Sequence, residues 1–189
     1  MTPQIPPNRV VVVGAVLAFS WLWLQWTHEA GHVLAGLATN ADLDRVVLDP
    51  RTFSRTDFII TPRPLITVWS GPIIGCLLGA GIPLIMTTRS PGWQSIGASI
   101  AAVVLLGNGA YIGLGAFMPV GDAEVMRDAG TPSWILASFG IVCAVLGRIC
   151  AKDGIRPWRD STDSPTRATV TLIAFTIPMA AIGWIFFPA

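Results

Sequence analysis

The chain has 189 residues, of which 52% are hydrophobic and only 12% are charged, and its formal net charge is +1. Soluble domains usually carry about 25% charged residues, so this composition indicates a protein whose solvent is partly a lipid bilayer. A net charge this close to zero provides no electrostatic basis for binding nucleic acid, and we expect no such partner.

Long apolar runs separated by charged linkers predict about five transmembrane helices, because about 20 apolar residues suffice to cross the hydrocarbon core. The expected spans are, in chain order, about 9–38, 65–88, 93–118, 132–150 and 167–187. We therefore predict an all-α membrane protein with a single membrane domain, residues 1–189. We expect an integral, multi-pass protein of a bacterial cell membrane, in contact with the lipid bilayer.

The first predicted span contains both histidines of the chain, in the motif His28-Glu29-Ala30-Gly31-His32. Residues four apart lie on one face of a helix, one turn apart, so His28 and His32 can bind one zinc ion together. Glu29 is placed to take a proton from an attacking water and pass it to a leaving amine. Ionisable side chains in a membrane span are costly, which favours this hypothesis over an ordinary polar helix face.

The linker at residues 40–64 is charged and contains two short stretches of high β propensity. These stretches are Arg45-Val46-Val47-Leu48 and Phe58-Ile59-Ile60-Thr61, and a proline ends each of them. We predict a short β-hairpin-like element here, between the first two helices. For the later charged linker, residues 151–165, we predict an irregular exposed loop.

Four residues in the later spans are predicted to have packing roles. Asn108 is a polar residue inside the third span, where side chains of this kind commonly make hydrogen bonds between helices. The three cysteines lack the spacing of a zinc or redox motif, and we expect them to pack as small apolar residues. They are Cys76, Cys143 and Cys150.

A catalytic zinc site needs three protein ligands and one open position, so the histidine pair requires a third donor. Asp122 follows the third span, which runs in the same direction as the first, so Asp122 and the motif lie toward one end of the bundle. Pro119 and Gly121 allow the chain to leave helical geometry there. We predict Asp122 as the third ligand, with Glu124 as the alternative. We do not expect Asn108 to be a ligand, because continuous helix would place it about 21 Å from Asp122.

Three motifs together resemble the site-2 protease family of intramembrane zinc metalloproteases. They are the histidine motif in the first span, Gly71-Pro72 in the second, and Pro119-Val120-Gly121-Asp122 after the third. The resemblance covers a core at about residues 10–126 and includes no PDZ domain. Two additional transmembrane helices, at about 131–187, match no motif of the family.

The resemblance implies an enzyme that hydrolyses a peptide bond in or near a transmembrane segment of a membrane-anchored protein substrate. It implies Zn²⁺ as the cofactor, held by His28, His32 and Asp122, with Glu29 as the catalytic base.

The resemblance also implies a β-like element beside the active site, where an extended substrate can pair with a strand edge. The substrate must unwind to expose its peptide bond, and a strand edge satisfies the freed backbone groups. The candidate substrate-binding residues are Val46, Val47, Ile59, Ile60, Gly71 and Pro72. The chain departs from the family pattern at two positions, because Gly75 replaces a common asparagine and Gly121-Asp122 replaces the usual Asp-Gly.

Two other functions are compatible with these residues. The departures from the family pattern favour a non-proteolytic membrane protein that retains the zinc site to bind a metal or a partner. A small transporter could use His28 and Glu29 in a proton or ion path. The tight spacing of the motif and the matching depth of Asp122 favour the protease.

Overall fold

The computed structural model describes residues 7–86, 91–160 and 166–189. Within these ranges the chain forms six helices and one two-stranded antiparallel sheet. The elements are α1 (Pro7–Ala38), β1 (Asp42–Val47), β2 (Arg55–Ile60), α2 (Pro64–Met86), α3 (Pro91–Leu114), α4 (Asp122–Asp128), α5 (Ser133–Asp160) and α6 (Thr166–Phe186). The predicted helical fold, with a hairpin between the first two helices, is confirmed.

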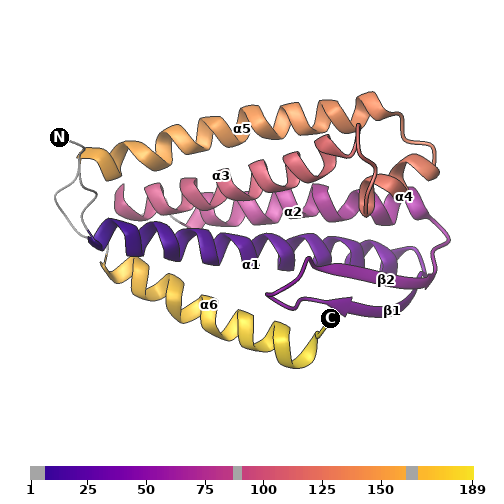
Figure 1. The fold of residues 1–189 in the computed structure, drawn as a ribbon, viewed down its shortest axis with the longest axis horizontal. Helices are drawn as coiled ribbons and strands as arrows, with labels where there is room; N and C mark the ends of the chain where they lie inside the picture. Colours follow the sequence, from indigo (N-terminus) through magenta and orange to yellow (C-terminus); the bar gives the residue numbers. More distant parts are fainter. Residues whose placement is uncertain (1–6, 87–90, 161–165) are drawn as a thin grey trace.

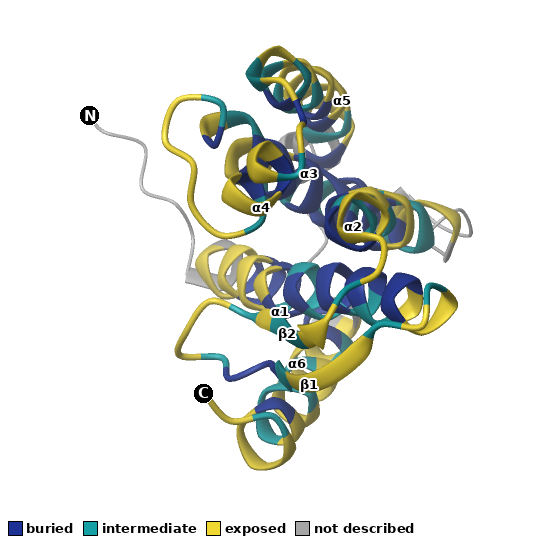
Figure 2. Cartoon of the chain, turned by 90° about the vertical axis from the view of Figure 1, so that its right-hand side faces the viewer, coloured by how far each residue is buried: buried dark blue, intermediate teal, exposed yellow. Residues whose placement is uncertain are grey.

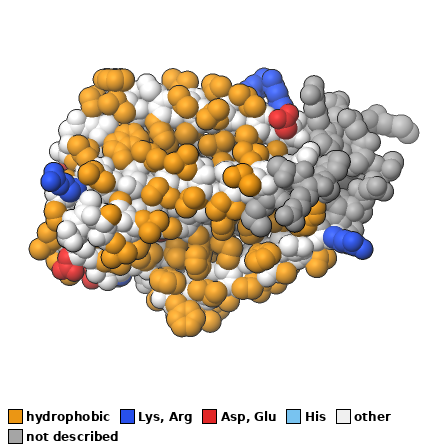
Figure 3. All heavy atoms as spheres, turned by 180° about the vertical axis from the view of Figure 1, so that it is seen from behind, with side chains coloured by type: hydrophobic (Ala, Val, Ile, Leu, Met, Phe, Trp, Pro, Cys, Tyr) orange, Lys and Arg blue, Asp and Glu red, His pale blue; other side chains and the backbone are white. Residues whose placement is uncertain are grey.

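Five of these helices, all except α4, are long and apolar enough to cross a membrane. Most of them lie roughly along one long axis, while α6 begins beside the N-terminal end of α1 and slopes away from it (Figure 1). Apolar side chains cover most of the face in Figure 3, and the visible charged side chains lie toward its two ends. These features are consistent with the multi-pass membrane protein that the composition predicts.

Helices α1, α2 and α3 pack together at the centre, with α5 against α3 and α6 against α1 (Figure 2). Small residues allow the closest approaches. A Cβ added at Gly113 of α3 would lie 2.9 Å from the Cα of Gly140 in α5, so these two backbones touch. The Sγ atoms of Cys76 and Cys143 lie 3.8 Å apart as free thiols, in agreement with their predicted packing role.

Two predicted boundaries are wrong. Helix α3 ends at Leu114 rather than near 118, because the chain turns back and α4 packs on the end of α3, with Ala123 against Gly115. Residues 151–160, predicted as part of an irregular loop, continue α5 as helix. Residues such as Ala151 and Lys152 favour helix, and they outweigh the charges and Pro157, on which the loop prediction rested. The rest of that linker, residues 161–165, lies outside the described ranges.

The hairpin lies alongside the C-terminal half of α1, at the same end of the bundle as α4 (Figure 1). Val46 of β1 pairs with Thr56 of β2, and the hydroxyl of Thr56 donates to Glu29, so β2 lies over the histidine motif. The connection between the strands is held on one side by Gln25 of α1, whose Nε2 donates to the carbonyl of Thr52 at 3.0 Å. This hydrogen bond holds the hairpin against α1 at this end of the bundle.

Candidate metal centre

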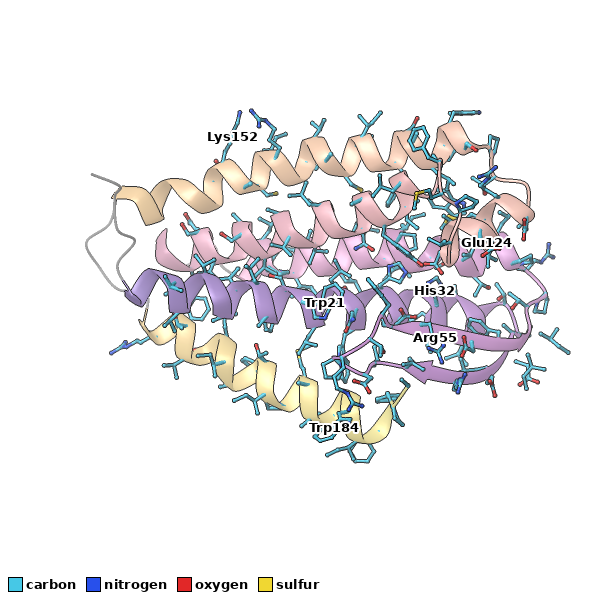
Figure 4. All side chains as sticks on the ribbon, in the orientation of Figure 1. Trp21, His32, Arg55, Glu124, Lys152 and Trp184 are labelled. Carbon is cyan, nitrogen blue, oxygen red and sulfur yellow. The ribbon has the colours of Figure 1, made fainter. Side chains whose placement is uncertain are left out.

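Helix α1 places both histidines in the interior, where each is only 5% exposed and the ring centroids are 4.9 Å apart. Figure 4 shows His32 among the helices, at the same end of the bundle as Glu124. Glycines let α1 and α2 meet here. A Cβ at Gly31 would overlap the carbonyl oxygen of Ser70, and one at Gly71 would overlap the ring of His32. The glycines of both predicted motifs therefore provide space for the imidazole.

Asp122 reaches the histidines through a tight turn before α4. Gly121 has φ 57°, a left-handed conformation that glycine adopts without strain. The backbone N–H of Asp122 donates to the hydroxyl of Tyr111 at 3.0 Å, which ties this turn to α3. The Oδ2 atom of Asp122 then lies 2.7 Å from Nε2 of His28 and 3.2 Å from Nε2 of His32.

The donor atoms of His28, His32 and Asp122 all lie within 4.8 Å of one another, a grouping that could hold a metal ion. The three predicted ligands are thus brought together. Glu124, the alternative third ligand, is exposed and does not belong to this group, although it lines the adjoining cavity. The geometry accordingly favours Asp122.

The hydrogen bonds of the imidazoles test whether this group suits a cation. Nδ1 of His28 lies 2.7 Å from Oδ1 of Asn108, and Nδ1 of His32 lies 2.9 Å from the carbonyl oxygen of Thr67. A neutral imidazole has a single N–H, and these acceptors require it on Nδ1. Each Nε2 then directs a lone pair toward the carboxylate of Asp122. A cation between these atoms removes the resulting repulsion, and imidazole nitrogen with carboxylate oxygen suits zinc.

The carboxyl of Asp122 is available as an anionic ligand. Burial raises its pKa, but proton donation from Nε2 of His28 and His32, when these imidazoles carry a second proton, lowers it, and the net pKa lies below the ordinary value. The group is therefore ionised at neutral pH.

Glu29 lies beside the metal-ligating atoms but is held by another element. Its side chain is 2% exposed, and its Oε2 accepts a hydrogen bond of 2.6 Å from the hydroxyl of Thr56 in β2. The predicted base is thus buried, oriented, and separate from the group of possible ligands.

A cavity of about 660 Å³ adjoins these residues. Its polar part includes His28, Glu29 and Asp122, and it extends to an apolar part between α1 and α3. The apolar part is lined by Leu17, Trp21, Leu24, Val103 and Gly107. From the hairpin, the lining residues are Phe53, Ser54, Arg55, Thr56 and Asp57.

The predicted substrate-binding residues lie elsewhere around the site, and none of them lines this cavity. Val47, Gly71 and Pro72 are buried, whereas Ile59 and Ile60 are more than 60% exposed. Val46 is half-buried opposite Thr56. Their role in binding a substrate stays a prediction. The hairpin residues that line the cavity are 53–57, in the connecting loop and the start of β2.

Three side chains at the site were not predicted to be there, namely Thr56, Asn108 and Tyr111. The expected separation of Asn108 from Asp122 was wrong, because α3 ends at Leu114 and the chain folds back, so the ring of His28 contacts both. The signal for Asn108 was its polarity within an apolar span. Tyr111, the chain's one tyrosine, and Thr56 carried no comparable signal.

Comparison with models of protein families found none that matches this chain. Comparisons with curated proteins and with solved structures found no match either. The candidate metal centre, the buried carboxylate of Glu29 beside it and the adjoining cavity are therefore the observations on which a function can be based.

Proposed function

We propose that this protein is an intramembrane zinc metalloprotease that hydrolyses a peptide bond in or near a transmembrane segment of a membrane-anchored protein. One observation carries the proposal. Two members of a possible three-ligand metal centre, His28 and Asp122, line one cavity together with a separate buried carboxylate, Glu29, at the end of an apolar helix bundle. Three ligands with a separate base and room for a substrate are the parts that metal-assisted hydrolysis requires.

His28, His32 and Asp122 would hold the zinc ion. When bound there, zinc would polarise the scissile carbonyl and favour ionisation of a nearby water. Glu29 takes a proton from the water as its oxygen forms a bond to the carbonyl carbon. The carbon–nitrogen bond then breaks, and Glu29 returns the proton to the leaving amine.

The residues that line the cavity support an extended, largely apolar substrate. Strand β2 pairs with β1 along one edge only, and residues 55–57 of β2 line the cavity beside Glu29. An unwound substrate could pair with such an edge and satisfy its backbone groups. Leu17, Trp21 and Leu24 provide apolar contacts along α1 for the adjoining side chains.

The test uses the full chain, purified in detergent and reconstituted in lipid vesicles with a panel of membrane-anchored reporter peptides. We expect Glu29→Gln to retain stoichiometric zinc while cleavage falls by about 10²–10⁴-fold, because the proton acceptor is lost. Asp122→Asn should lose zinc and cleavage together. Asp128→Asn, an exposed carboxylate at the end of α4, is the matched control and should change neither property.

The outcomes separate the alternative functions. Full activity in the Glu29→Gln variant would contradict the mechanism. Stoichiometric zinc without cleavage of any reporter would instead favour a metal- or partner-binding protein. Activity that follows an ion gradient and survives chelation would favour a transporter.

A further inference from the structure

Asn108 is a buried amide in the C-terminal half of the apolar helix α3, only 1% exposed to solvent. Burial of an amide without partners is costly, so its hydrogen bonds indicate why it is tolerated. Its Oδ1 lies 2.7 Å from Nδ1 of His28, across the interface between α3 and α1. The amide therefore faces the side of the imidazole that is directed away from the metal-ligating atoms.

A second hydrogen bond orients this amide. Nδ2 of Asn108 donates to the carbonyl oxygen of Val104, one helical turn earlier, at 3.3 Å. With the amide nitrogen engaged there, the oxygen is the atom that faces His28. An amide oxygen only accepts hydrogen bonds, so Nδ1 of His28 must carry the proton. The lone pair of that imidazole is then on Nε2, the atom nearest to Asp122.

Helix α2 leaves space for this contact at Gly75. A Cβ at Gly75 would lie 3.2 Å from Nδ2 of Asn108 and 3.3 Å from the Cα of His28. Both distances are tighter than ordinary van der Waals contact. Three helices thus meet around one amide and one imidazole, with little freedom for either ring or amide to rotate.

The two histidines are oriented in different ways. His32 donates to the backbone carbonyl of Thr67, and a substitution of the Thr67 side chain leaves that carbonyl in place. His28 depends on the side chain of Asn108 for the same function. An outer hydrogen bond of this kind fixes the tautomer of a ligating histidine and raises its basicity.

We propose that Asn108 is a positioning residue that holds His28 in the tautomer and orientation required to bind the metal ion. The inference rests on the metal centre of the proposed function, but it does not depend on proteolysis.

The experiment measures zinc affinity by competition with a chromophoric chelator on the full chain in detergent. Asn108→Leu, which has a similar volume and no acceptor, should weaken zinc binding by about 10- to 100-fold. Asn108→Asp supplies an acceptor oxygen and should restore most of that loss. Ser99→Ala is the control on the same helix, since it removes only the bond from Ser99 to the carbonyl of Ser95. Asn108→Ala replaces the leucine variant if the latter fails to fold.

A measurement on the metal-free protein gives a second readout. Because the chain has only two histidines, ¹⁵N-histidine labelling produces signals from two imidazoles alone. We expect Nδ1 of His28 to carry a proton in the wild type, whether the imidazole is neutral or charged, and to lose that preference in Asn108→Leu.

Three results would overturn the inference. One is wild-type zinc affinity in Asn108→Leu, and another is equal weakening by Asn108→Leu and Ser99→Ala. The third is a wild type that binds no stoichiometric zinc, which would also remove the metal centre. Zinc binding that follows the expected order of variants, without any cleavage, would overturn only the protease proposal.

Discussion

At the scale of single residues, the histidine motif depends on partners from other elements. Thr56 of β2 donates to Glu29 at 2.6 Å, and Asn108 of α3 faces His28 at 2.7 Å. Both contacts are polar and lie next to apolar helices, where a hydrogen bond is stronger than it is in water. The motif provides the reactive groups, and its neighbours determine how those groups are directed.

Replacement of Thr56 tests how far the hairpin orients the base. Thr56→Val keeps the shape but removes the donor, at a cost of roughly 1.5–3 kcal/mol for a hydrogen bond to a charged group. If the proposed mechanism operates, kcat should fall about tenfold or more. Zinc content should be unchanged. Thr56→Ser retains the hydroxyl and should remain close to the wild type. Equal kcat in the valine and serine variants, measured on one reporter peptide, would contradict this role.

Asp49, in the loop of the hairpin, makes the stability of this region depend on pH. Hydrogen bonds from the side chain and then the backbone of Arg51 lower the pKa of the Asp49 carboxyl from 3.8 to about 2. Because the folded-state pKa lies below the ordinary value, ionised Asp49 stabilises the fold above about pH 4. This contribution is lost as the pH falls through about 2.

Thermal unfolding in detergent, measured from neutral to acidic pH, checks this dependence. The wild type should lose more stability than Asp49→Asn between about pH 4 and 2, since the amide cannot titrate. Asp44→Asn, at an exposed position in β1, is the control. Parallel curves for the wild type and the Asp49 variant would contradict the prediction.

At the scale of elements, the C-terminal helix α6 supports the hairpin. The N–H of Leu48 donates to the carbonyl of Phe187 at 2.9 Å, and the guanidinium of Arg51 lies 5.3 Å from the ring centroid of Trp184. Gly183 permits this approach, because a Cβ there would overlap the carbonyl oxygen of Leu48. A helix that matches no recognised motif therefore holds the wall of the cavity.

Gly183→Ala should loosen the hairpin without altering the metal ligands. The added methyl displaces α6 at a cost of about 1–3 kcal/mol. The open form, in which the hairpin has separated from α6, should therefore become roughly tenfold more populated. Limited trypsin cleavage after Arg51, whose side chain is 66% exposed, measures that form. Gly81→Ala is the matched control, since apart from the backbone of its own helix no atom lies within 4 Å of the added Cβ. Equal cleavage rates in both variants would show that α6 does not hold the hairpin.

At the scale of the whole molecule, the cavity connects the candidate metal centre at one end of the bundle with apolar residues inside the predicted membrane spans. Val103 and Leu17 lie on helices that cross this region, while Arg55 and Glu124 line the other part of the cavity. Figure 4 places Arg55 and Glu124 toward the same end of the molecule, on opposite sides of His32. A substrate segment that extends from lipid into water would meet apolar residues in the first part of the cavity and polar residues in the second.

Val103→Trp tests whether the apolar part of the cavity receives the substrate. The larger side chain fills that space, and cleavage of an apolar reporter should fall about tenfold or more through KM. Zinc binding should be retained. Leu77→Trp, on the exposed surface of α2, controls for the added bulk. Unchanged KM in the Val103 variant would place the substrate elsewhere.

Features that depend on local pattern could be predicted from the amino-acid sequence. Apolar length predicted the five long helices, β-prone stretches between prolines predicted the hairpin, and spacing four apart placed His28 and His32 on one helix face. The direction of successive spans also placed Asp122 near them. These features could be predicted because each follows from a repeat, a length or an alternation along the chain.

Contacts between distant segments could not be predicted, because they form only when the helices pack. Asn108 reaches His28 because α3 packs against α1, and Thr56 reaches Glu29 because β2 lies over the motif. Helix α4 was not predicted, since seven residues are too few for a periodic pattern, and it is positioned by burial of Ala123 and Met126. Such contacts depend on how whole helices fit together, so the motif could identify the reactive groups but not the residues that orient them.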